Sequence, residues 1–166
     1  DTGVLTRRVR DELGRLAAER PELLILADSR QGLAGWPPVG FKMNAAELAT
    51  LLGEVGAPTI DVVQKQAREL AQRNRRAVYI TMSERGVIGA EPSGEWEHVP
   101  TLPIRGPIDI VGAGDAVTAN LAASLAAGAN LRESLELAMA GAGVVIHQLG
   151  TTGTATRTQL ADALGL

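Results

Sequence analysis

The 166 residues, of which 45% are hydrophobic, are enough for one packed core, so a single globular domain is expected. Acidic and basic residues nearly balance at a net charge of −3, which disfavours a nucleic-acid or anionic-membrane surface. The sequence has no cysteine and only two histidines, which excludes disulfides and cysteine catalysis and leaves few zinc ligands. With neither a bilayer-length apolar run nor a leader-like N-terminus, a cytoplasmic protein is expected.

The first half of the chain alternates helical and extended patterns. Apolar residues recur at helical spacing over residues 5–17, and the apolar run 23–27 predicts a buried strand. A loop rich in Gly and Pro then leads to the short segment 41–43, and a helix is expected over 44–52. An amphipathic pattern from residue 60 to residue 70, followed by the β-rich run 77–82, predicts a further helix and strand.

The second half begins with a turn and a hairpin. Residues 87–99 follow the turn at 83–86, and short extended pieces predict antiparallel strands at one edge of the sheet. Helices are expected after residue 115, over 131–146 and over 157–164. The alternation predicts an α/β fold with a mostly parallel sheet flanked by helices, in which ligands bind at strand C-terminal ends and helix N-termini.

The segment Gly112-Ala113-Gly114-Asp115 carries the strongest chemical signal. Glycines let the backbone approach a ligand closely, and the free N–H groups at the start of the following helix bind anions such as a phosphate. Asp115 would lie beside that phosphate and could accept the proton of an attacking hydroxyl, mainly by orienting it. The local pattern fits equally well an acidic residue that only stabilises the first turn of a helix.

A dinucleotide-binding fingerprint is a competing interpretation of the same glycines. Gly112 and Gly114 match the first two glycines of the pattern GxGxxG. The third glycine position holds Val117, which disfavours a Rossmann-type dehydrogenase.

Three motifs resemble those of the ribokinase-like (PfkB-type) carbohydrate kinases. Residues 109–115 resemble the family's Asp-Thr-x-Gly-Ala-Gly-Asp signature. Residues 44–47 resemble its Asn-x-x-Glu motif, and residues 81–86 resemble its Thr-x-Gly-x-x-Gly nucleotide turn. The motifs follow the family's order, and the similarity extends over nearly the whole chain. The 83–86 turn and the helix 121–128 are most similar to the heptose-phosphate kinase branch.

The resemblance implies a ribokinase-like fold, with residues 1–166 as its C-terminal, nucleotide-binding portion. It implies ATP-dependent phosphoryl transfer to a hydroxyl of a sugar or sugar phosphate, with Mg²⁺ and a monovalent cation as candidate cofactors. Asp115 would be the general base, and Gly112, Ala113 and Gly114 would form the anion hole. Glu47 would act on the metal through a bound water. The residues implied to contact the nucleotide are Asn44, Glu47, Thr81, Ser83, Gly86 and Asp109.

A second interpretation exists for Asn44 and Glu47. In a capping box, Asn44 caps the helix and Glu47 folds back onto it. Taken alone, the local pattern favours the capping box; the neighbouring motifs favour the nucleotide site.

Several features depart from the family pattern. Ile110 stands where the signature has Thr, Val111 does not restore the hydroxyl, and Met139 stands where the heptose branch often has Asn. Family members are considerably longer, and the part that precedes this region supplies most sugar contacts. The alternative function is therefore a noncatalytic nucleotide-binding or oligomerisation domain. A homo-oligomer is expected because a shortened fold would leave a sheet edge uncovered.

Overall fold

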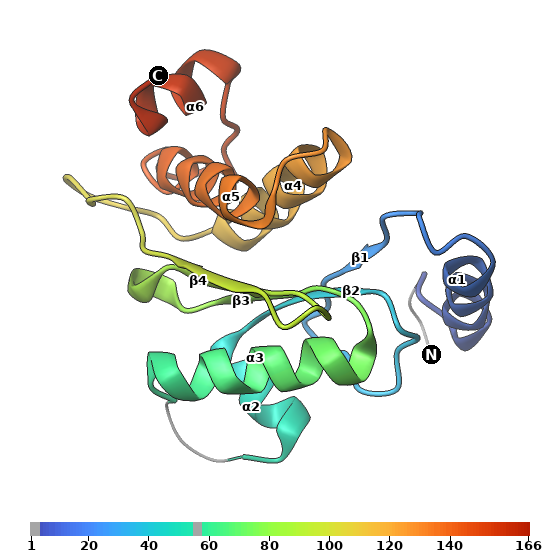
Figure 1. Cartoon of the computed structure of the whole chain (residues 1–166). Coiled ribbons are helices and arrows are strands. Elements are labelled where there is room, and N and C mark those ends of the chain that lie inside the picture. Colours follow the sequence, from blue (N-terminus) through green and yellow to red (C-terminus); the bar gives the residue numbers. More distant parts are fainter. Residues whose placement is uncertain (1–3, 55–57) are drawn as a thin grey trace.

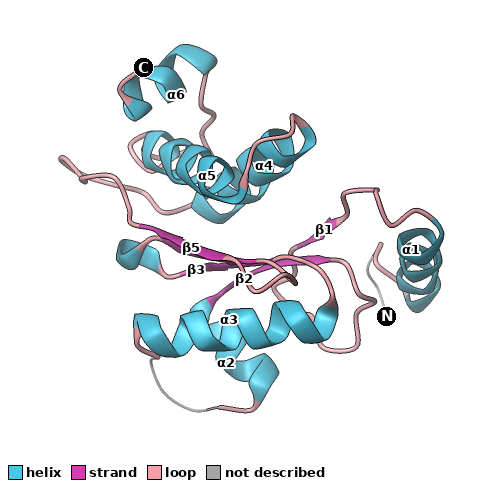
Figure 2. Ribbon diagram, in the orientation of Figure 1, coloured by secondary structure: helices cyan, strands magenta, loops and turns pink. Residues whose placement is uncertain are grey.

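The computed structural model describes residues 4–54 and 58–166, which form a central sheet between two helical layers (Figure 1). Helices α4 (Ala113–Ala126) and α5 (Leu131–Val145) cover one face, and α2 (Ala45–Leu52) and α3 (Ile60–Asn74) cover the other (Figure 2). Helix α1 (Arg7–Glu19) lies beside one edge of the sheet, and α6 (Arg157–Leu164) packs on α5. None of the helices in these two ranges is long and apolar enough to span a membrane.

The strands confirm the expected combination of parallel strands and a hairpin. Their order in the sheet is β1 (Leu26–Ala27), β2 (Gly40–Asn44), β3 (Val78–Thr81), β4 (Val87–Ala90) and β5 (Trp96–Val99). The first three strands run parallel, and β3, β4 and β5 pair antiparallel. A short 3₁₀ turn, η1 (Ser83–Arg85), connects β3 to β4.

The strand predicted over residues 23–27 is shorter than expected. Only Leu26 and Ala27 pair with β2. The N–H of Leu23 instead donates to the carbonyl of Arg20 in a turn that follows α1, and Leu23 and Leu24 are 39% and 43% exposed. The apolar run predicted that all five residues would be buried, but the first two lie in the turn, and hydrogen bonding to β2 begins only at Ile25, whose carbonyl accepts from the N–H of Gly40.

Side chains alternate between two cores, one on each face of the sheet. Phe41, Met43 and Ile80 pack with α3 in one core, and Tyr79 packs with Leu121 of α4 in the other. The two-residue period of a strand sends neighbouring side chains to opposite faces.

The parallel register brings two predicted site residues together. Asn44, the last residue of β2, is paired with Thr81, the last residue of β3. Parallel strands end at the same edge of a sheet, so this edge is where ligands of such folds bind.

Candidate functional site

A cavity of about 440 Å³ opens at the edge where β2 and β3 end. Its size falls within the roughly 300–1,000 Å³ typical of small-molecule sites. Residues from the N-terminus of α4, from α5 and from the 101–110 loop complete its wall. Residues distant in sequence thus meet at one place. The predicted site residues that line the cavity are Asn44, Thr81, Ser83, Gly86, Ala113 and Gly114.

The other predicted site residues lie around this cavity and are not part of its wall. Gly112 and Asp115 lie in the same turn and helix start as Ala113 and Gly114, which do line it. Asp109 precedes the glycine turn and accepts a hydrogen bond from the N–H of Gly150. Glu47 lies in the first turn of α2.

Gly112 is the residue that lets the chain turn into α4. Its φ is +84°, in the left-handed region that side chains disfavour, and a Cβ there would overlap the backbone carbonyl of Thr152. The positive φ and the close contact with Thr152 therefore both require glycine at position 112. Among the described residues, none accepts a hydrogen bond from the N–H of Gly114 or Asp115. These two groups at the start of a helix of 14 residues are available to an anion.

Asp109 holds this turn in place. One oxygen of its carboxylate accepts from the N–H of Val111 at 3.0 Å, and the other accepts from the N–H of Gly150 at 3.1 Å. These two hydrogen bonds, the one from Val111 first, lower the pKa of Asp109 below its ordinary value. The carboxylate therefore ties the glycine turn to the 149–153 loop, whereas direct contact with a nucleotide stays a prediction.

Asp115 is exposed in the first turn of α4. It lies one residue after Gly114, which borders the cavity. A carboxylate there is within reach of solvent and of a ligand held at the helix start. A role for Asp115 in orienting a hydroxyl beside a bound phosphate stays a prediction.

Lys42 precedes Asn44 by two residues on β2. In the structure it is 5% exposed and points to the α4 face, opposite to Phe41 and Met43. Its ammonium donates to Asp28 at 2.9 Å, and the Thr118 hydroxyl of α4 donates to the same carboxylate oxygen at 2.9 Å. A Cβ on Gly114 would come within 3.2 Å of the Lys42 Nζ. A buried positive charge therefore lies against the first turn of α4.

The Asp28–Lys42 pair gives a first testable expectation. Asp28→Ala should lower the free energy of unfolding by about 2 kcal/mol, because it leaves the Lys42 charge buried without its partner. Lys42→Met should cost less, since the Asp28 side chain is 27% exposed and stays hydrated. Urea unfolding of both variants measures the difference. An Asp28→Ala variant as stable as the native chain would contradict the pairing.

Asn44 and Glu47 form the capping box that their spacing suggested. The Asn44 side chain accepts from the N–H of Glu47 at 2.9 Å, and a Glu47 oxygen accepts from the N–H of Asn44 at 2.7 Å. The second Glu47 oxygen has no partner in this motif, so a role toward metal-bound water stays a prediction. Across residues 4–54 and 58–166, no three His, Asp or Glu side chains gather into a group that could hold a metal directly.

The turn after β3 keeps a strained backbone. Ser83 stands where the resembled pattern has Gly, yet its φ is +53°, a region that residues with a Cβ adopt at a cost. Gly86 is buried, and a Cβ there would overlap the carbonyl of Val99. The need for glycine at residue 86 therefore comes both from its φ of +88° and from its close contact with Val99, whereas Ser83 is one of the residues that line the cavity.

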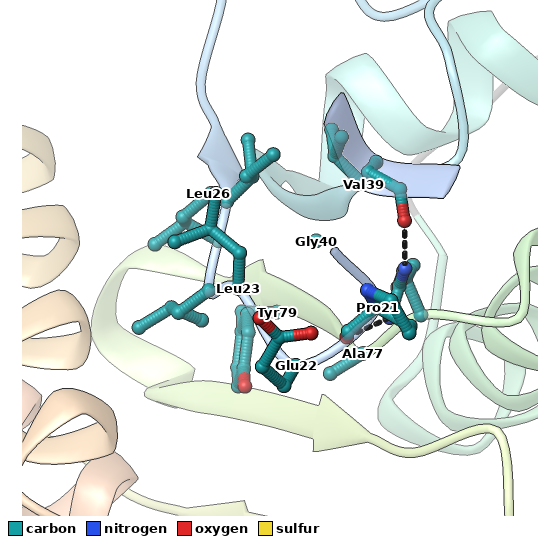
Figure 3. Close-up of a pocket in the computed structure, with 12 residues that line it drawn as sticks. Pro21, Glu22, Leu23, Leu26, Val39, Gly40, Ala77 and Tyr79 are labelled. Carbon is teal, nitrogen blue, oxygen red and sulfur yellow. Dashed lines mark hydrogen bonds between the residues drawn. The ribbon is translucent and has the colours of Figure 1, made fainter. Parts of the chain in front are cut away.

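A smaller hollow of about 200 Å³ lies between the end of α1 and the sheet edge (Figure 3). It contains none of the predicted site residues. Arg76, which lines it, donates to the carbonyls of Ala17 and Pro21, so it fastens α1 to the sheet. Burial, with a smaller effect from Glu91, raises the pKa of Tyr79 to about 12, which keeps this phenol neutral. The hollow is therefore part of the packing between α1 and the sheet.

Known proteins resemble this chain in sequence. Residues 39–158 match the family described as pfkB family carbohydrate kinase. A bifunctional protein HldE from Shewanella baltica is 38% identical over 123 residues, which are 74% of this chain and 25% of that protein. The chain thus spans about a quarter of the length of the curated relatives that it matches.

Solved structures resemble it in fold. The ribokinase of Arabidopsis thaliana, solved with ribose and ATP, superimposes with a TM-score of 0.81 at 17% identity, over 95% of this chain and 52% of that one. Phosphofructokinase-2 of Escherichia coli, solved with potassium, gives a TM-score of 0.68 at 23% identity, over 76% and 40% of the two chains. The ribokinase-like fold expected from the sequence is confirmed.

Proposed function

The chain belongs to the pfkB family of carbohydrate kinases, and from this premise we propose that it supplies the nucleotide site and the catalytic base for ATP-dependent phosphoryl transfer to a sugar or sugar-phosphate hydroxyl. One observation carries the proposal. The cavity joins the residues of two nucleotide-type motifs, Asn44 and Thr81 among them, to the free N–H groups at the start of α4.

The triphosphate would lie toward the N-terminus of α4. The N–H groups of Gly114 and Asp115 would provide partial positive charge there. Such fixed groups stabilise the charge that develops on the transferred phosphoryl group. The adenine ring of ATP would lie against the aliphatic part of the cavity wall.

Asp115 would act on the acceptor. The hydroxyl oxygen forms a bond to the γ-phosphorus, the bond from that phosphorus to the bridging oxygen breaks, and ADP leaves. The hydroxyl proton passes to the Asp115 carboxylate. Because this transition state is loose, the main contribution of the carboxylate is to orient the hydroxyl.

Magnesium suits the oxygen-rich surroundings of Asn44 and Glu47, where Glu47 would hold a metal-bound water through its second oxygen. When bound, the ion would neutralise charge on the phosphates. We also propose that the rate of transfer depends on a monovalent cation. Replacing potassium with a larger organic cation in the assay tests this dependence.

The similarity to HldE and the motif resemblance favour a heptose phosphate as the first acceptor to test. A second candidate function is nucleotide binding without transfer. It is favoured by Ile110, which is 73% exposed and replaces the hydroxyl of the family signature at the cavity edge.

The 166-residue chain by itself should bind ATP weakly and release little ADP when sugar is added. Transfer needs the acceptor held in line and water excluded, and the chain covers only 52% of the ribokinase fold to which it is similar. Calorimetry with Mg-ATP, and ADP release with a panel of sugars and sugar phosphates, measure both. Efficient sugar-dependent ADP release would contradict this expectation, because it would require a complete acceptor site within these residues.

A further inference from the structure

Thr118 connects the start of helix α4 to the sheet. It lies on α4, three residues after Asp115. Its hydroxyl is 2.9 Å from the Oδ2 of Asp28, the residue that follows β1, and 3.0 Å from the carbonyl oxygen of Gly114. Both oxygens accept from this one hydroxyl, so Thr118 links the Asp28 carboxylate to the backbone of the glycine turn.

Lys42 fixes the carboxylate that Thr118 contacts. The Nζ of Lys42, on β2, donates to the same Asp28 oxygen at 2.9 Å. The Lys42 side chain is 7% exposed, so its ammonium has little contact with water. Hydrogen bonds between charged groups are about twice as strong as those between neutral groups. Asp28 therefore offers the Thr118 hydroxyl an acceptor whose position is set by the ends of β1 and β2.

The same ion pair lies against the glycine turn. A Cβ on Gly114 would be 3.2 Å from the Lys42 Nζ, closer than the ~3.5–4.0 Å of an ordinary van der Waals contact. Gly114 lines the candidate nucleotide cavity. Asp115 is exposed beside it, so the backbone of this turn determines where its carboxylate lies. The turn that carries Asp115 is thus in contact with the sheet through both Thr118 and Lys42.

From these contacts we infer that Thr118 is a positioning residue for phosphoryl transfer, which is held by Asp28 and acts through Asp115. Its hydroxyl fixes the first turn of α4 relative to the strand ends, and so fixes the direction in which Asp115 meets the acceptor hydroxyl. Residues three apart in a helix are neighbours on its surface, so a contact at Thr118 restrains the segment that carries Asp115. A displacement of about 1 Å at a reacting group can lower a rate by about 10²-fold. The inference rests on the proposed function, because it requires Asp115 to be the base.

Two substitutions at Thr118 test the role of the hydroxyl. Thr118→Val replaces the hydroxyl by a methyl group of similar size, whereas Thr118→Ser keeps the hydroxyl. In the complete reading frame that contains this chain, Thr118→Val should lower kcat by about tenfold or more, because a hydrogen bond to a charged group contributes at least this factor. The KM for ATP should change less than kcat, since Thr118 is not part of the cavity wall. Thr118→Ser should retain most of the native rate.

Thr50 on α2 provides the matched control. Its hydroxyl donates to the carbonyl of Ala46, four residues earlier, at 2.9 Å, as the hydroxyl of Thr118 does to the carbonyl of Gly114. Thr50→Val therefore loses the equivalent bond within a helix and leaves the contact with Asp28 intact, so kcat should stay near the native value. An equal fall of kcat in both valine variants overturns the inference. A Thr118→Val variant with native kcat, or a Thr118→Ser variant as slow as Thr118→Val, also overturns it.

A double-mutant cycle with Asp115→Asn separates positioning from a structural role. If Thr118 acts through Asp115, adding Thr118→Val to Asp115→Asn should lower kcat further by less than about twofold, because the group to be positioned has already been lost. A purely structural role would give the same factor in both backgrounds, which overturns the inference and leaves the proposed function intact. Native turnover in Asp115→Asn alone would overturn both, since Asp115 would then not be the base.

Discussion

Asp115→Asn should lower kcat by at least about 10²-fold, because a positioned acid–base group commonly contributes 10²–10⁴-fold. The asparagine side chain has nearly the same shape but cannot accept the hydroxyl proton. The affinity for ATP should change little, since Asp115 lies outside the cavity wall. Steady-state kinetics of the complete reading frame that contains this chain measure kcat and the KM for ATP separately.

A matched control is available in Asp61, which is also an exposed acidic residue in the first turn of a helix, on the other face of the sheet. Asp61→Asn removes the same favourable interaction with a helix N-terminus, worth about 0.3–1 kcal/mol of stability, without touching the site. Turnover near that of the native protein in Asp115→Asn would remove Asp115 from the mechanism. An equal loss in both variants would indicate a stability effect.

The second large effect is expected at Gly112. Gly112→Ala must hold a side chain at a φ of +84°, which costs about 1–2 kcal/mol. It must also relieve an overlap with the Thr152 carbonyl, which adds about 1–3 kcal/mol. The free energy of unfolding should therefore fall by roughly 2–5 kcal/mol. Because the turn positions the free N–H groups of α4, nucleotide binding should be lost as well.

Gly128 is the comparison for this variant. Its φ is +86°, and a Cβ there would meet nothing within 4 Å. Gly128→Ala should therefore lose only the stability that the positive φ costs. The difference between the two variants in free energy of unfolding, measured with urea, then gives the contribution of the contact with Thr152. Equal losses of stability in the two variants would mean that the 149–153 loop does not press on the glycine turn.

The local sequence was sufficient to predict most helices and strands, because helix caps, turns and apolar periodicity each involve only neighbouring residues. Asn44 and Glu47 at capping-box spacing predicted the start of α2, and the capping box is present. The hairpin of β4 and β5 followed from short extended runs around a turn. The strand predicted over residues 23–27 was too long, because only Leu26 and Ala27 form β1. Its apolar composition predicted burial. Whether a residue is buried depends on how close it lies to the sheet, and composition gives no information about that distance.

The sequence by itself determined the fold family and the glycine turn, since both depend on motifs of neighbouring residues. Only the tertiary structure decided which of these residues share a cavity, because the parallel register sets Asn44 beside Thr81 and the first residues of α4 line the same cavity. It also showed the Asp28–Lys42–Thr118 contacts, which join residues 90 positions apart in the chain. A lysine in an apolar strand was the available signal, but its partners come from other elements and become neighbours only when the sheet and helix pack together.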